Sequence, residues 1–185
     1  MFFNTIREKS NIFIIWILFT FKLRHSILKR MKISIGIRAN PNQVYYAVIR
    51  EDETTINVLL LDKIIVPKPL DTPEQLKFIR STLRDIINEN KVSVACIRIA
   101  ESNARTLNIP RVYLEGVIQE LIASSEVNKY YVGQISNISA KLGIDRAGFK
   151  PIANGEDGFM NMEIWTEINL EERESIMAAV SALKL

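Results

Sequence analysis

The stretch from Lys32 to Glu51, KISIGIRANPNQVYYAVIRE, decides how this chain folds. Isoleucines at every second position of Ile33–Ile37 alternate with small or polar residues, which predicts a β-strand with one apolar face. The segment Asn40–Asn42 has turn chemistry, and Val44–Arg50 is rich in the aromatic and β-branched residues that favour strands. The stretch therefore predicts two antiparallel strands joined by a tight turn, with Arg38 at the end of the first.

The rest of the chain alternates between strand and helix patterns. In order, we predict a strand at Ile56–Val66, a helix at Thr72–Ile87, a strand at Val92–Ala100, a helix at Pro110–Ala123, a strand at Lys129–Gln134, a short helix at Ser136–Leu142, a loop at Gly143–Thr166 and a final helix capped by Asn169. The fourth strand is apolar almost throughout, as expected of a buried parallel strand. The loop is rich in glycine and charge, which predicts a long and mobile flap.

Three residues in the helical segments carry predictions of their own. Thr72 is the predicted N-cap of the first helix, with Gln75 closing a capping box. Gly116 indicates either close approach of its helix to another backbone or a glycine that is simply tolerated. Glu115 belongs with the scattered acids that we expect on the solvated surface.

The order of elements predicts an α/β domain. Three antiparallel strands come first, followed by two parallel strands with helical crossovers, so we expect a five-stranded mixed sheet flanked by helices. The first and fourth strands should lie side by side and parallel at the centre of the sheet. Ligands in sheets of this kind bind at the carboxyl ends of such strands.

Composition excludes several classes of site. A chain of 185 residues is long enough for one domain with a substantial core. The single cysteine, Cys96, excludes an internal disulfide and a cysteine-based zinc site within one chain, and its apolar neighbours predict a buried small hydrophobe. The single histidine, His25, lies outside the folded pattern, which argues against histidine catalysis and histidine metal binding.

Charge is divided unevenly along the chain. The net charge is +3, and residues 1–30 hold six cations and one acid, or +5, so residues 31–185 carry 3 − 5 = −2. Bulk charge in the second part therefore gives no support for a nucleic-acid footprint. A local basic patch is still open, formed by Arg80, Arg84, Arg98, Arg105, Arg111 and Lys141.

Residues 1–30 form an extension outside the predicted core, which comprises residues 31–185. The apolar run Ile12–Phe21 is flanked by cations and is short for a membrane span. Three interpretations compete. The working protein begins at Met31, or the run is an interfacial membrane anchor with Trp16 at the headgroups, or it is a helix that packs on a partner.

The order of elements over Met31–Leu185 resembles the ribonuclease H-like arrangement, and within that group the RuvC kind of Holliday-junction resolvase. The matching segments are the apolar-Gly-apolar turn at Ile35–Asn40, the fourth-strand residues Cys96–Ile99, the glycine-containing helix Arg111–Ala123, and the pair Glu171 and Glu174 on the last helix. The family has an aspartate where this chain has Arg38, and a glutamate on the fourth strand where this chain has Arg98.

The resemblance implies phosphodiester cleavage by two Mg²⁺ ions about 4 Å apart, held by carboxylate oxygens. A guanidinium group stays protonated in proteins, so Arg38 and Arg98 would repel these ions. We therefore predict no metal at this site. We expect the two arginines to form a cluster with Glu171, Glu174 or Glu101, or to offer a phosphate clamp. The alternative is that both arginines face solvent at the strand ends.

Three functions are consistent with these residues. The first is a catalytically degraded RuvC-like protein of the cytoplasm, which binds nucleic acid or a protein partner in a larger assembly, with Arg38, Arg98 and Lys141 as the candidate nucleic-acid-binding residues. The second is an active Mg²⁺-dependent nuclease using Glu101, Glu171 and Glu174, with one further acid from Asp145–Asp157. The third is a membrane-associated interaction module, if residues 1–30 are retained. A cofactor, Mg²⁺, is expected only for the second, and a homodimer is an open alternative.

Overall fold

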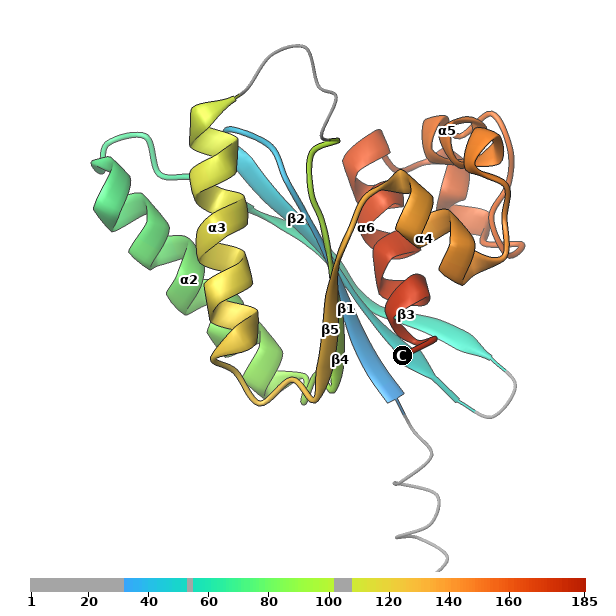
Figure 1. Cartoon of the computed structure of the whole chain (residues 1–185), viewed down its shortest axis with the longest axis horizontal. Coiled ribbons are helices and arrows are strands. Elements are labelled where there is room, and N and C mark those ends of the chain that lie inside the picture. The colour runs from blue at the N-terminus through green and yellow to red at the C-terminus, as the bar shows by residue number, and fades with distance from the viewer. Residues whose placement is uncertain (1–31, 53–54, 102–107) are drawn as a thin grey trace, which may run out of the picture. The chain divides into compact units, whose positions relative to one another are not determined.

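The computed structural model describes residues 32–52, 55–101 and 108–185, which build one five-stranded sheet with helices on both faces (Figure 1). The strands are β1 (Lys32–Ala39), β2 (Gln43–Glu51), β3 (Ile56–Ile65), β4 (Val94–Arg98) and β5 (Lys129–Gly133). The helices are α2 (Thr72–Glu89), α3 (Ile109–Ala123), α4 (Ile135–Leu142), α5 (Arg146–Asn154), the 3-10 helix η1 (Glu163–Thr166) and α6 (Leu170–Ala182).

The order of strands in the sheet is β3-β2-β1-β4-β5, which confirms the predicted topology. β1 pairs antiparallel with β2 and parallel with β4, and β5 continues the sheet in parallel. The turn between β1 and β2 is closed by the side chain of Asn40, whose Oδ1 accepts from the backbone N–H groups of Asn42 and Gln43. Because β1 and β4 run parallel in register, Arg38 at the end of β1 lies level with Arg98 at the end of β4.

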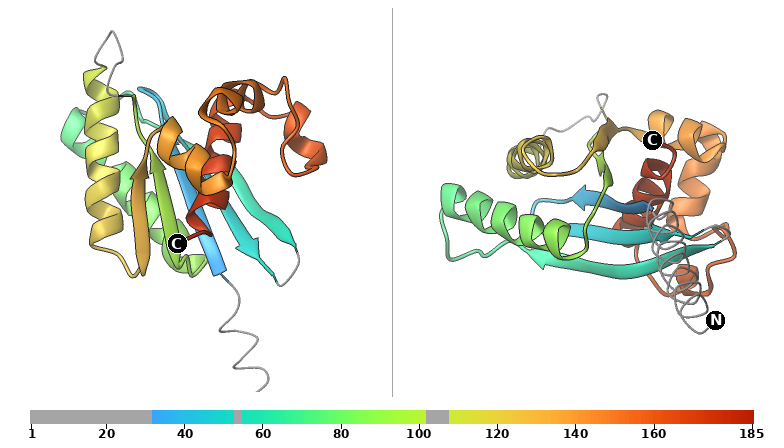
Figure 2. Two further views of the ribbon diagram at one scale, coloured as in Figure 1. Left: turned by 45° about the vertical axis from the view of Figure 1, so that its right-hand side comes forward. Right: turned by 90° about the horizontal axis from the view of Figure 1, so that it is seen from below.

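Two apolar cores lie on opposite faces of the sheet. The helices α2 and α3 cover one face, and α4, α5 and α6 cover the other (Figures 1 and 2). Ile35 and Ile37 of β1 pack under α2 and α3 with Ile79 and Ile118. Gly36 and Arg38 alternate with those isoleucines and therefore face α6. The period of the first strand thus decides which residues meet the last helix.

The helix α6 is buried along most of its length. Every residue from Arg173 to Leu183 is buried, because the sheet lies on one side of the helix and α4 and α5 lie on the other. Its approach to β1 depends on Gly36. A methyl group at that position would come within 3.0 Å of three backbone atoms of α6, in Ser175, Ala178 and Ala179.

The prediction of a flap at Gly143–Thr166 is wrong. The segment contains α5 and η1, and it is anchored on the sheet side by the buried rings of Phe149 and Trp165. The indole Nε1 of Trp165 donates to the carbonyl of Ile152 at 3.0 Å. The buried Arg173 of α6 donates to the carbonyl of Trp165 at 2.8 Å.

Some local predictions for the helices need correction. Asp71 is at the N-cap of α2 and Thr72 is the first helical residue, while the Gln75 side chain donates to the carbonyls of Pro67 and Leu70 instead of closing a capping box. Among the described residues outside its own helical turn, no heavy atom lies within 4 Å of a methyl group placed on Gly116, so no close approach to another element is found there.

The predicted strand and helix bounds shift by a few residues. The largest change is in the fourth strand, which is shorter than Val92–Ala100. Among the described residues, no helix has the length and apolar character needed to cross a membrane. The extension 1–30, with its three interpretations, lies outside the described residues, as does Arg105.

Candidate functional site

The candidate site lies where β1 and β4 end side by side, the position at which sheets of this kind bind ligands. Arg38 and Arg98 both project from the α6 face of the sheet. The Arg98 residue is only 3% exposed, and its guanidinium lies 6.0 Å from the centre of the Phe149 ring of α5. Arg38 is partly buried, with 14% of its side chain exposed. Neither arginine simply faces solvent.

Glu174 connects the two arginines. The helix α6 brings its carboxylate over the ends of both strands, where Oε2 pairs with Nε of Arg38. The other oxygen, Oε1, pairs with Nη2 of Arg98 at 3.4 Å. The Glu174 residue is 6% exposed, so a buried carboxylate bridges two guanidinium groups. The predicted ion pairs of Arg38 and Arg98 with Glu174 are confirmed.

Glu101 lies just beyond β4 and adds a second carboxylate. Its Oε1 pairs with Nη1 of Arg98 at 3.2 Å, as predicted. The same oxygen accepts from the backbone N–H of Ile135 at 2.9 Å, at the first residue of α4. Arg98 Nη1 also donates to the carbonyl of Ile99. Glu101 therefore ties the end of β4 to the start of α4.

Glu115 of α3 is a third carboxylate at the same place, and the prediction that it is solvated surface is wrong. It is 7% exposed and accepts from Nε of Arg111 at 2.7 Å and from the backbone N–H of Ala100 at 3.0 Å. Nη1 of Arg38 lies 3.9 Å from it. The spacing of Arg111 and Glu115, one helical turn apart after the fourth strand, is the sequence signal that could have identified this pair.

We call Arg38, Arg98, Arg111, Glu101, Glu115 and Glu174 the arginine–glutamate cluster. It contains three cations and three anions, so its formal charge is zero. Burial lowers the pKa of Arg98, while the charge of Glu174 opposes that shift. Burial also raises the pKa of Glu115. Burial disfavours the charged forms of both Arg98 and Glu115. Opposite charges and hydrogen bonds from the rest of the cluster favour those forms, so the charge of each of these two residues depends on its partners.

The cluster does not fit the two Mg²⁺ ions that the resemblance implies. Magnesium needs carboxylate oxygens that are free to coordinate in near-octahedral geometry. Each carboxylate of the cluster is already paired with a guanidinium, and the two strand-end positions carry cations. Throughout the described residues, no group of three or more His, Cys, Asp or Glu side chains is arranged to hold a metal ion.

Two predicted site residues lie outside the cluster. Within the described ranges, Glu171 makes no ion pair, and its charge acts instead on Tyr45, whose pKa is raised by burial and then by Glu171. The ammonium of Lys141 lies 4.9 Å from the centre of the Tyr131 ring on β5. The acids of Asp145–Asp157 that the nuclease hypothesis would recruit are exposed, and none pairs with a cluster member among the described residues.

Comparison with known proteins gives a match in fold. No protein-family model matches the sequence, and no curated protein matches it either. Thermus thermophilus RuvC superposes with a TM-score of 0.63 at 9% identity, over 82% of this chain and 93% of that one.

A second structure of this resolvase, in complex with a Holliday junction substrate, superposes with a TM-score of 0.62, the same identity and the same coverage. The yeast mitochondrial Holliday junction resolvase Ydc2 superposes with a TM-score of 0.53 at 11% identity, over 83% of this chain and 78% of that one. The chain therefore has the ribonuclease H-like fold of RuvC and other Holliday junction resolvases.

Proposed function

We propose that this protein is a RuvC-like protein without metal-dependent cleavage, which acts by binding nucleic acid. The observation that carries the proposal is the arginine–glutamate cluster at the ends of β1 and β4. Guanidinium groups there form ion pairs with the buried carboxylates, which supports a site held together without divalent cations. Cleavage by two metal ions needs free acids at those same positions.

Nucleic-acid binding is supported by the fold and by cations on the same side of the sheet. One of the similar structures is a RuvC bound to a Holliday junction substrate. Arg38 is a partly exposed member of the cluster, and Lys141 is partly exposed over Tyr131. We propose that these two side chains contact phosphates, whereas the buried Arg98 holds Glu101 and Glu174 in place through its ion pairs.

A cleavage assay separates this proposal from the active nuclease that would use Glu101, Glu171 and Glu174. Branched and single-stranded DNA are incubated with the protein and Mg²⁺ or Mn²⁺. We expect no products with either ion. Metal-dependent products that disappear on substitution Glu174→Gln would establish the nuclease instead.

Salt-dependent binding tests the interaction with nucleic acid. Fluorescence anisotropy with labelled branched DNA should show affinity that falls with salt, because phosphate contacts release counterions. Lys141→Gln should reduce the salt slope by about one. Lys184→Gln is the control, since that exposed lysine lies at the far end of α6 from Glu174. Absence of salt-dependent binding to DNA and RNA would refute the proposal and favour a protein partner.

We also propose that the protein forms a homodimer and that it is located in the cytoplasm. Sedimentation equilibrium of residues 31–185 and of the full chain measures the first. N-terminal sequencing of the native protein shows whether residues 1–30 are retained, on which the membrane-associated alternative depends.

A further inference from the structure

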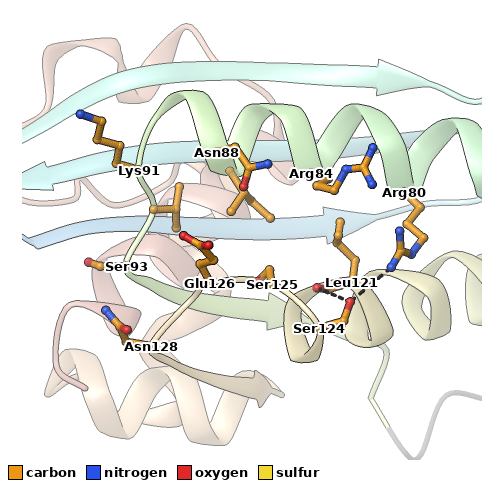
Figure 3. Close-up of a pocket in the computed structure, with 12 residues that line it drawn as sticks. Arg80, Arg84, Asn88, Lys91, Ser93, Leu121, Ser124, Ser125, Glu126 and Asn128 are labelled. Carbon is orange, nitrogen blue, oxygen red and sulfur yellow. Dashed lines mark hydrogen bonds between the residues drawn. The ribbon is translucent and has the colours of Figure 1, made fainter.

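A pocket lies at the opposite end of β4 from the cluster. It has a volume of about 670 Å³ and opens between the carboxyl-terminal ends of α2 and α3, beside the start of β4 (Figure 3). Its floor is apolar and comes from the buried side chains of Ile87, Val92 and Leu121. The volume is within the range of small-molecule sites, roughly 300–1,000 Å³.

One end of the pocket is cationic. Arg80 and Arg84 lie one turn apart on α2 and both line the pocket. Arg80 is held in place by a bidentate ion pair with Glu120, because its Nε donates to Oε2 at 2.7 Å and its Nη2 donates to Oε1 at 3.3 Å. Its Nη2 also donates to Ser124 Oγ at 3.3 Å, whereas Nη1 takes part in none of these bonds. The guanidinium is therefore pre-positioned with donors left for a ligand.

Arg84 supplies a charge that is not strongly paired. The carboxylate with which it forms an ion pair is Asp85, at 3.9 Å, and more than half of each side chain is exposed. Exposed pairs of this length contribute little and are easily exchanged. A phosphate placed between Arg80 and Arg84 would gain charge-assisted hydrogen bonds from both.

The other end of the pocket suits hydroxyl groups. Glu126, Asn128 and Ser93 line it, away from Arg80 in the close-up (Figure 3). Lys91 lines the same end, with its ammonium drawn pointing away from Glu126. A carboxylate repels an anion but accepts hydrogen bonds from hydroxyl donors, and the Asn128 amide can both donate and accept. The two ends thus differ in the chemistry that they can bind.

We propose that this pocket binds a phosphate ester of a pentose, either free or as part of a nucleoside monophosphate. The phosphate would lie at Arg80 and Arg84, the sugar hydroxyls at Glu126 and Asn128, and the ring over the apolar floor at Leu121. This assignment is independent of the nucleic-acid binding proposed above, because the pocket and the cluster lie at opposite ends of β4.

Isothermal titration calorimetry of the full chain tests the proposal with three probes: inorganic phosphate, ribose 5-phosphate and adenosine monophosphate. We expect ribose 5-phosphate to bind at least tenfold more tightly than inorganic phosphate. Tighter binding of adenosine monophosphate than of ribose 5-phosphate identifies the nucleotide as the source, and equal binding identifies the sugar phosphate. Either result supports the site.

Two variants test the two ends of the pocket separately, and both change exposed side chains, so neither should unfold the protein. Arg84→Gln should weaken ribose 5-phosphate about tenfold, since it removes a charge-assisted contact. Glu126→Gln should weaken ribose 5-phosphate but leave inorganic phosphate unchanged or bound more tightly. Arg146→Gln, at an exposed arginine on α5, is the matched control. Equal affinity for phosphate and ribose 5-phosphate, no effect of Arg84→Gln, or binding of oligonucleotides alone would overturn the proposal.

Discussion

Removing the charge of Glu174 tests whether the cluster holds the centre of the fold together. The substitution Glu174→Gln keeps the shape of the side chain but leaves Arg98, which is 3% exposed, with Glu101 as its remaining carboxylate in the cluster. Breaking a buried pair from one side costs about 3–5 kcal/mol, because a charge stays buried without its counter-ion. Glu101 still neutralises part of that charge, so we expect the lower end, about 3 kcal/mol.

That loss is large enough to measure in two ways. A free energy of unfolding of roughly 5–15 kcal/mol is ordinary for a single domain, so about 3 kcal/mol is a substantial share. For a domain of this size each 1 kcal/mol lowers Tm by roughly 2–4 °C, which gives a decrease of about 6–12 °C. Urea unfolding followed by circular dichroism should show the lower midpoint with an unchanged slope.

A second pair of variants separates the charge effect from a general loss of packing. The double variant Arg98→Met with Glu174→Leu removes both charges and should be more stable than Glu174→Gln alone, since apolar replacements of a buried pair are often neutral. Glu171→Gln, in the first turn of the same helix and outside the cluster, should cost less than about 1 kcal/mol. The single variants Arg98→Met and Glu174→Leu complete the cycle. If the free energy of unfolding of Glu174→Gln is within 1 kcal/mol of the wild type, or if the loss in the double variant equals the sum of the two single losses, the cluster does not stabilise the fold.

Three further predictions use other parts of the structure. Gly36→Ala should lower the free energy of unfolding in urea by about 3 kcal/mol or more, because the new methyl group collides with backbone atoms of α6. The control Gly116→Ala should raise it by about 0.5–1 kcal/mol, and equal effects of the two substitutions would contradict this packing. Burial raises the pKa of Cys96 to about 11, so alkylation at pH 8, followed by mass spectrometry, should require unfolding; rapid labelling without urea would refute it. Mn²⁺ should raise the Tm of the Arg38→Asp/Arg98→Asp variant and leave the wild-type Tm unchanged; a wild-type increase would show that the cluster accepts metal.

The central part of the site could be predicted from sequence because a strand has a fixed period. Once the isoleucines of Ile33–Ile37 are assigned to one core, Gly36 and Arg38 must face the other side. Parallel pairing then places Arg98 level with Arg38. These steps depend only on local geometry and on the order of elements, and both can be inferred from the sequence.

The burial of Glu115 and the elements α5 and η1 depend on contacts that no periodic pattern in the sequence indicates. Glu115 looks like one more acid on a helix, and its burial follows from the way α3 closes over the end of β4. Phe149, Phe159 and Trp165 are isolated aromatic anchors in a stretch rich in glycine and charge, so no repeating pattern indicates α5 and η1. Where one large ring supplies most of the burial, periodicity cannot identify the element.

The close packing of α6 on β1 explains why Glu174 lies between the two arginines. The carbonyl of Ser175 lies against Gly36, and this contact carries the preceding residue, Glu174, to the middle of the sheet. A carboxylate that is only 6% exposed is stabilised by protonation, by a metal ion, by hydrogen bonds or by a cation. In this structure the two oxygens of Glu174 pair with guanidinium groups from two different strands. Arg38 and Arg98 each pair with one oxygen, and we infer that replacing either by an acid would create a requirement for divalent cations.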